Sequence, residues 1–253
     1  LRAVLRLRND DRAVQAGDYL LKRPRNIFAV ARIIANGEFG LEPRRITIPE
    51  GATVADMSSM YSRHLLRFDP ETFFEGAIEF EGYLFPDTYY FLPNATEEAV
   101  IETMRDNFNR RIAGLAPQIE ASGYTLHEVV TMASLIEKEA RNERDRRLIS
   151  GVLWNRFERN MLLQVDATFI YTHGKGTYDI TLAELLDKDN LYNTYAHAGL
   201  PPGPIAAPSE SSLRAAINPI ESDYLFYLAD RSGTTYYSET YEEHLRKKQI
   251  YVD

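Results

Sequence analysis

The chain has 253 residues, of which 44% are hydrophobic and 26% charged, values typical of a soluble globular protein and not of a disordered chain. Its formal net charge of −8 argues against nucleic acid as the main partner. The absence of cysteine excludes disulfides, thiolate metal sites and cysteine nucleophiles.

The first part of the chain predicts a small α+β unit over residues 1–78. The pattern indicates two strands, a helix, a third strand and a second helix. We expect these elements at 1–12 (turning at 9–11), 16–23, 26–36, 44–51 and from 54 onward. Asn26 and Thr53 are the expected helix caps, and Gly37 is the expected stop. No glycine-rich phosphate loop follows either strand, so a large doubly wound sheet is not expected.

A domain boundary is predicted near residue 78, because the residue composition changes at Glu81, where the aromatic and turn-rich segment EGYLFPDTYYFLP begins. The remainder, 79–253, is expected to form a helix-rich domain, which makes the fold class α+β. Helices are predicted at 96–112, 125–141, 143–159 and 181–187. A further helix is predicted to begin after a cap at Ser209 or Ser211, and a β-hairpin is predicted over 223–238. The long Pro- and Gly-rich stretch between 162 and 209 is typical of a functional loop.

The segment TMASLIEKEA, residues 131–140, ends an apolar helical pattern with two glutamates. At about 100° per residue, Val129 and Ile136 lie on the buried stripe, and Glu137 and Glu139 fall on opposite flanks of it. Both carboxyls therefore cannot face one cleft. A carboxyl among apolar neighbours is pushed toward its protonated form, the state that a general acid needs. The alternative is an ordinary solvated helix end, although the macrodipole disfavours acidic residues there.

Other catalytic patterns fail on their spacing. His127-Glu128 begins like a zinc-binding HExxH motif, but Thr131 occupies the position of the second histidine. The segment His173 to Thr177 lacks the glycine and hydroxyl positions of a P-loop. There is no G-x-S-x-G elbow, and the five histidines are scattered. We therefore predict neither a metal nor a cofactor.

Aromatic and amide side chains are frequent in the turn-rich segments after residue 80. Stacking faces and amides are what an elongated, uncharged sugar polymer requires. Any single tyrosine is more readily a core residue with a bonded hydroxyl, but together, in Pro- and Gly-rich loops, these side chains favour a groove. The candidates are Tyr83, Phe85, Tyr89, Tyr90, Asn155, Gln164, Tyr171, Tyr192, Asn193, Tyr195 and Asn218.

Several segments resemble the YceG-like family of endolytic murein transglycosylases, in the order found in that family. They are QAGDYLL (15–21), TIPEGATV (47–54), EGYLFPDTY (81–89), ASLIEKEA (133–140), GVLWNRF (151–157), LLQVDATFIY (162–171), YNTYAHAGLPPGPIAAPS (192–209) and AAINP (215–219). The resemblance therefore covers nearly the whole chain.

The resemblance implies a bacterial enzyme anchored in the cytoplasmic membrane and acting on its outer side, with a LysM-like N-terminal subdomain. The implied reaction cleaves the bond between N-acetylmuramic acid and N-acetylglucosamine within glycan strands and leaves a 1,6-anhydro end, without a cofactor. One glutamate would serve as both acid and base. The chain begins at Leu1 and has no long apolar run, so we expect that an anchor has been removed from its start.

Site residues follow from matching the motifs. Glu139 is favoured over Glu137 because LIEKEA resembles the apolar-x-x-Glu-Ser segment of other lytic transglycosylases. Substrate contacts are expected from two groups, the loop residues Tyr192, Asn193, Tyr195 and Pro201, and the residues Gln164, Asp166, Tyr171 and Asn155.

Two rival functions stay open. One is a non-catalytic module that binds peptidoglycan and positions a cell-wall synthase. The other is a hydrolase with Asp166 as the partner carboxylate.

Overall fold

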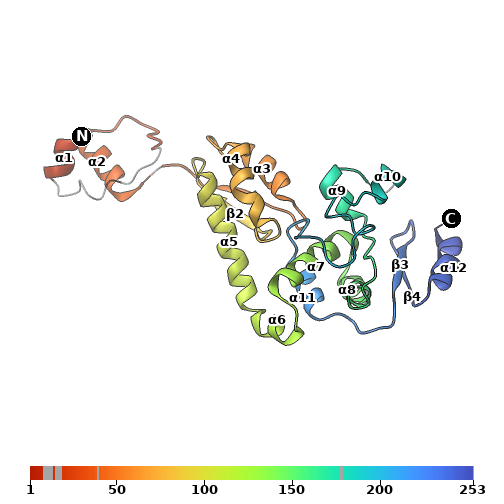
Figure 1. The fold of residues 1–253 in the computed structure, drawn as a ribbon. Coiled ribbons are helices and arrows are strands. Elements are labelled where there is room, and N and C mark those ends of the chain that lie inside the picture. The colour runs from red at the N-terminus through yellow and green to blue at the C-terminus, as the bar shows by residue number, and fades with distance from the viewer. Residues whose placement is uncertain (8–13, 15–18, 39, 177–178, 253) are drawn as a thin grey trace.

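The computed structural model describes residues 1–7, 14, 19–38, 40–176 and 179–252. Within them the chain is an α+β protein, rich in helices, with small antiparallel sheets (Figure 1). The elements are α1 (Arg2–Leu7), α2 (Ile27–Asn36), β1 (Arg44–Thr47), α3 (Val54–Ser62), α4 (Pro70–Ala77), the 3-10 turn η1 (Ile78–Phe80), β2 (Thr88–Phe91), α5 (Glu97–Ala113), α6 (Ala116–Ser122), α7 (Leu126–Glu139), α8 (Glu143–Glu158), α9 (Ala167–His173), α10 (Leu182–Leu185), α11 (Glu210–Ile217), β3 (Phe226–Ala229), β4 (Thr235–Ser238) and α12 (Tyr241–Tyr251).

The two strands predicted at the start of the chain are wrong where the structure describes them. Residues 2–7 form the helix α1, and residues 19–23 form no strand. The expected turn at 9–11 and residues 16–18 lie outside the described residues. An isolated strand leaves its backbone groups unpaired, whereas a helical turn bonds them locally, as in the Leu5 amide donating to the Leu1 carbonyl.

The helix α2 forms as predicted. The Asn26 side chain accepts a hydrogen bond from the Ala29 amide at 2.8 Å, and Gly37 ends the helix with a φ of 65°.

A first hydrophobic core contains side chains from β1, α3, α4, β2 and α5. The strands β1 and β2 pair antiparallel, with Ile46 opposite Tyr89. Thr53 caps α3 through a capping box with Asp56. Tyr61 is fully buried at the centre of this core, with aromatic rings around it. The strand β2 and the helix α4 were not predicted, and both are needed to close this core.

A second core surrounds α7, whose residues 129–136 are all buried. The helices α8 and α11 pack against α7, as Figure 1 shows for the centre of the molecule. The helix begins at its predicted cap, Thr125, and ends at Glu139, because Ala140 has an extended backbone with φ of −108° and ψ of 140°. Glu139 is therefore the last helical residue.

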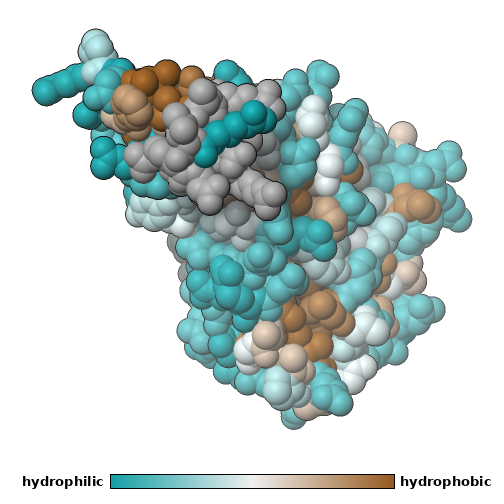
Figure 2. Space-filling model, turned by 90° about the vertical axis from the view of Figure 1, so that its left-hand side faces the viewer, coloured by the Kyte–Doolittle hydropathy of each residue, from teal (hydrophilic) through white to brown (hydrophobic). Residues whose placement is uncertain are grey.

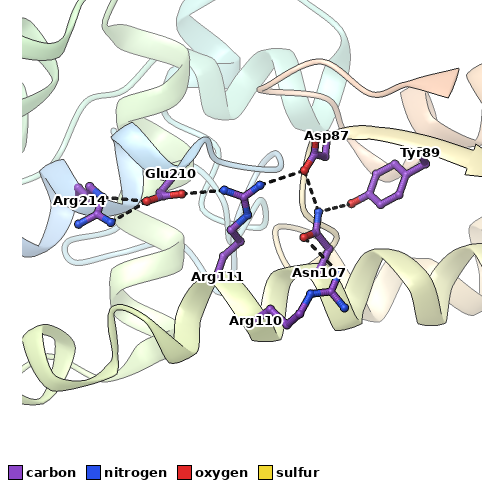
Figure 3. Close-up of polar contacts among 7 residues, drawn as sticks. All are labelled: Asp87, Tyr89, Asn107, Arg110, Arg111, Glu210 and Arg214. Atoms are coloured by element: carbon purple, nitrogen blue, oxygen red, sulfur yellow. Dashed lines mark hydrogen bonds and ion pairs between the residues drawn. The ribbon is translucent and has the colours of Figure 1, made fainter. Parts of the chain in front are cut away.

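A polar network links the two cores at the surface (Figure 3). Arg111 of α5 contacts Asp87, ahead of β2, at 3.1 Å and Glu210 of α11 at 3.0 Å. Glu210 also pairs with Arg214, and the Asn107 amide bonds Asp87 and the Tyr89 hydroxyl. The ion pairs are partly open to solvent, so each contributes modestly, and their main effect is to fix α5 and α11 relative to β2.

The face of the molecule seen from its N-terminal side is mainly hydrophilic and carries a few apolar patches (Figure 2). Large apolar side chains left exposed before residue 30 include Leu20, Leu21, Ile27 and Phe28. In the part of the chain that the structure describes, no helix combines the length and apolarity needed to span a bilayer.

Candidate active site

Glu139 lies in a cavity of about 690 Å³, which we call the Glu139 pocket. Side chains from α7, α8, α9, the β3–β4 hairpin and α12 line it. Its polar lining residues are Lys138, Glu139, Arg156, Gln164, Asp166, Tyr195, Tyr227, Thr235, Tyr241, His244 and Lys248. Elements from both ends of the helix-rich region therefore converge on the carboxyl at the end of α7.

The Glu139 carboxyl is held in conditions that favour its neutral form. The pKa of Glu139 is raised to about 7, mainly by burial; the hydrogen bond from Tyr227 opposes the rise, and the Asp166 carboxylate adds to it. That bond runs from the Tyr227 hydroxyl of β3 to Oε2 of Glu139 at 3.0 Å. The position at the C-terminal end of α7 acts in the same direction as burial, since the negative end of the helix dipole disfavours a carboxylate.

Glu137 has a different environment on the other flank of α7. Its carboxylate accepts hydrogen bonds from the backbone amide and hydroxyl of Ser209, and Arg146 lies 3.5 Å from it. Its side chain is 6% exposed, and it does not line the Glu139 pocket. These contacts are typical of a structural carboxylate that ties α7 to the N-terminus of α11. The two glutamates lie on separate sides, as the helical wheel predicts.

Arg156 of α8 organises the walls of the pocket. Its Nε donates to the Leu225 carbonyl at 2.6 Å, and its Nη1 donates to the Leu162 and Leu163 carbonyls at 3.1 and 2.9 Å and to Oε1 of Gln164 at 3.2 Å. The side chain thereby joins α8 to the segment before β3 and to the loop after Met161. Burial lowers the pKa of Arg156, yet a guanidinium stays charged at neutral pH.

Three of the predicted substrate-binding residues line the Glu139 pocket. They are Gln164, Asp166 and Tyr195. The Tyr195 hydroxyl donates to the Asp166 carboxylate. Gln164 has a φ of 54°, an uncommon backbone conformation for a residue other than glycine, and its side chain is fixed by Arg156.

The other predicted residues lie elsewhere. The Asn193 amide donates to three backbone carbonyls between residues 184 and 187, and the Asn155 amide donates to the carbonyls of Ser222 and Tyr224. Both side chains are thus engaged in shaping loops. Pro201 is buried and lines no described pocket. Tyr171 and Tyr192 contact each other, with ring centroids 5.2 Å apart, beside a neighbouring pocket.

Three residues of this region were missed in the sequence analysis. Arg156 carried a signal, since a basic residue interrupts the apolar stretch GVLWNRF. Tyr227 carried none, because its role depends on the hairpin folding back onto α7. Glu81 opens a segment that was noted only for its aromatics, and it is a second buried carboxyl, 6% exposed.

The arrangement fits proton transfer by a single carboxyl. Because burial raises the pKa of Glu139 to about 7, this carboxyl is suited to give a proton to an oxygen and to accept one afterward. Within the described residues, no group of His, Asp or Glu side chains is placed to hold a metal ion. Asp166 lies in the same pocket and is the one described carboxylate there that could act as a partner.

Known proteins resemble this chain over most of its length. A model of the YceG-like family matches residues 1–250. A Bacillus subtilis protein named endolytic murein transglycosylase is 34% identical over 265 aligned positions, covering 94% of this chain and 73% of the relative. A Streptococcus pneumoniae protein of the same name is 38% identical over 178 positions, covering 68% of this chain and 32% of that protein. The crystal structure of a YceG-like protein from Listeria monocytogenes matches with a TM-score of 0.72 and 30% identity, covering 96% of this chain and 87% of the other.

Proposed function

The chain belongs to the YceG-like family, and we propose on that premise that it is an endolytic murein transglycosylase. It cleaves the bond between N-acetylmuramic acid and N-acetylglucosamine inside glycan strands. The observation that carries the proposal is the Glu139 carboxyl, whose pKa is raised by burial to about 7 at the edge of an open pocket. The names of the Bacillus and Streptococcus relatives support the same reaction class.

In the proposed mechanism Glu139 is the only catalytic acid and base. Its proton passes to the glycosidic oxygen as the bond from that oxygen to C1 of the muramic acid breaks. The C6 hydroxyl of the same sugar then bonds to C1 and gives its proton to the Glu139 carboxylate. The 1,6-anhydro ring forms, no water is consumed, and the enzyme returns to its starting protonation state. The Tyr227 hydroxyl, 3.0 Å from Oε2, steadies the carboxylate between the two proton transfers.

The substrate is held by the residues that share the pocket with Glu139. Gln164, Asp166 and Tyr195 supply hydrogen-bonding groups to sugar hydroxyls and acetamido groups. Of the loop from Tyr192 to Pro201, Tyr195 reaches the wall of the Glu139 pocket, and Asn193 holds the shape of the loop through its bonds to backbone carbonyls. Glu137 keeps a structural role, supported by its bonds to Ser209.

The proposal includes a LysM-like subdomain at residues 1–78 and a catalytic domain at 79–253. The two hydrophobic cores support a division into two domains but not its position at residue 78, since the first core takes in residues up to Met104 and also Ala207. Side chains of β2 and α5 complete the first core, so the two domains share elements on either side of residue 78. The LysM-like part would add affinity for the glycan strand.

We propose that the protein works on the outer side of the bacterial cytoplasmic membrane and is attached there by a membrane anchor. Murein is found on that side of the membrane, and the relatives are named for acting on murein. Cell-wall synthases are the proposed protein partners, since they make the strands that this reaction would cut.

The decisive experiment compares Glu139→Gln with Glu137→Gln on purified murein sacculi, with products read by mass spectrometry. Glu139→Gln should release no anhydro ends while still sedimenting with sacculi, and Glu137→Gln should keep most of the activity. The reverse result would transfer the catalytic role to Glu137.

The wild-type products separate the rival functions in the same assay. Reducing ends in place of anhydro ends would select a hydrolase that uses Asp166. Binding without any product would select a non-catalytic module that positions a synthase.

A further inference from the structure

A second pocket lies next to the Glu139 pocket. This second cavity has a volume of about 500 Å³, and we call it the Glu81 pocket. Lys138, Ala167 and Ile170 line both pockets. The helix α9 and the Lys138 side chain therefore border both cavities, which form two neighbouring lobes. Residues of α3 and α4 wall the Glu81 pocket on its other side.

The walls of the Glu81 pocket present large apolar side chains to solvent. Phe74 is 40% exposed, Ile78 39% and Ile170 48%. Phe74 lies in α4 and Ile78 directly follows it, whereas Ile170 lies in α9. These side chains therefore border the cavity from opposite sides. Apolar surface gathered around a concave site is typical of a ligand site. The C–H faces of a sugar ring are suited to pack on such walls.

Hydrogen-bonding groups lie together in the depth of the pocket. The Glu81 carboxyl accepts the backbone amide of Val54 at 3.1 Å, and the Tyr171 hydroxyl lies beside it, with Tyr192 next to Tyr171. The pKa of Glu81 is raised to about 7, mainly by burial and against the pull of the Val54 and Gly82 amides. Within that balance Asp56 contributes to the rise and Lys138 opposes it. A carboxylic acid and a phenol can each donate and accept, which matches hydroxyl and acetamido groups.

The two lobes differ in charge. Only the Glu139 pocket has basic residues of its own, Arg156 and Lys248, which lie there beside the carboxyls of Glu139 and Asp166. The charged residues that line only the Glu81 pocket, Asp56 and Glu81, are both acidic. In murein the muramic acid carries the peptide stem with its carboxylates, and N-acetylglucosamine is uncharged. The Glu139 pocket thus favours the unit with the anionic substituent, and the Glu81 pocket favours the neutral neighbour.

We propose that the Glu81 pocket is a saccharide subsite that binds an N-acetylglucosamine unit of the strand being cut, adjacent to the muramic acid in the Glu139 pocket. The Glu81 carboxyl bonds the acetamido or hydroxyl groups of that sugar, and Phe74 and Ile78 pack on its ring. This inference rests on the proposed transglycosylase function and extends it. Filling both lobes with one strand would place the cleaved bond in its interior.

Tryptophan substitutions at the exposed rim of the Glu81 pocket test the proposal, because their side chains fill the cavity. Ala55 is exposed on the first turn of α3 and lines the Glu81 pocket, so Ala55→Trp blocks the cavity without disturbing either core. Ile78→Trp does the same from the end of α4. The matched control is Ala113→Trp, because Ala113 is an exposed residue at the end of α5 that lines neither pocket. Thermal unfolding of each variant checks that the fold is kept.

The readouts are KM and kcat for anhydro-end release, and inhibition by chitotetraose, an uncharged tetramer of N-acetylglucosamine. Both pocket variants should raise KM about tenfold, with kcat changed by less than about threefold, and should lose a similar factor in chitotetraose inhibition. Ala113→Trp should match the wild type.

The subsite proposal is overturned if both folded pocket variants keep the wild-type KM and inhibition, or if kcat falls while KM stays constant. An inactive wild-type protein would instead defeat the proposed function itself. In that case chitotetraose binding, measured by calorimetry on the wild type and on Ala55→Trp, still decides whether the Glu81 pocket binds the sugar.

Discussion

Replacing Glu139 by glutamine should make the protein more stable at alkaline pH while removing its activity. The pKa of Glu139 is raised from 4.5 to about 7 in the folded protein. The folded state therefore binds this proton more tightly than the unfolded state does. As pH rises from 4.5 through 7, the unfolded chain ionises first, and the contribution of Glu139 to stability falls. Glutamine does not titrate, so it escapes this loss.

The size of the effect follows from the pKa change. At about 1.4 kcal/mol per unit, a rise from 4.5 to about 7 gives an upper limit of roughly 3 kcal/mol above pH 7. The carboxyl opens onto the Glu139 pocket, where solvent screens part of this cost, so we expect a gain of about 1–2 kcal/mol for Glu139→Gln at pH 8. For a chain of this size, such a gain raises Tm by about 2–6 °C.

The matched control is Glu137→Gln, the same substitution two residues earlier on α7. It removes a carboxylate that is bonded to Ser209 and paired with Arg146, so it should lower stability at pH 8 by about 1–3 kcal/mol. The assay is urea and thermal unfolding of the three proteins at pH 4 and pH 8. The reasoning is refuted if Glu139→Gln is no more stable than the wild type at pH 8, or if its advantage is equally large at pH 4.

Three further outcomes are expected. Activity should be highest below neutral pH and fall about tenfold for each unit above pH 7, because Glu139 must be protonated; a flat profile between pH 6 and pH 9 would contradict this role. Tyr227→Phe should raise the pH at which activity falls by about one unit and lower kcat about tenfold, since the hydroxyl stabilises the Glu139 carboxylate. The control is Tyr236→Phe on the neighbouring strand, which removes a hydroxyl bonded to Asp230 and should leave both the pH profile and kcat unchanged. Asn193→Ala should destabilise the fold by about 2 kcal/mol, measured in urea, because three backbone carbonyls lose their donor.

The elements that the sequence predicted well are those with local signals. Asn26, Thr53, Thr96 and Thr125 each cap a helix that begins at the next residue, because a capping bond joins residues only three positions apart. The helix α4 had such a signal as well, an aspartate cap followed by proline, and it was overlooked.

Strands were harder to predict than capped helices. The strand β2 needs β1, more than 40 residues earlier, as its partner, and its sequence TYYF could equally belong to an aromatic loop. At the start of the chain, alternating residues predicted a strand for which no partner exists in the described sheets. Alternation of apolar and polar residues indicates which face of a strand would be buried. It does not indicate whether another strand lies close enough to pair with it.

The two glutamates of α7 show why the candidate site could be narrowed but not settled from the sequence. Their positions on the helix are nearly equivalent, one on each flank of the same apolar stripe. What separates them are partners that arrive from 72 residues away for Glu137 and 88 residues away for Glu139. The Glu137 carboxyl is engaged by donors from Ser209 and by Arg146, whereas Glu139 meets the Tyr227 phenol and a buried, partly apolar pocket. The difference in surroundings, on which the proposed assignment of the acid rests, is therefore a property of the segments that close over α7.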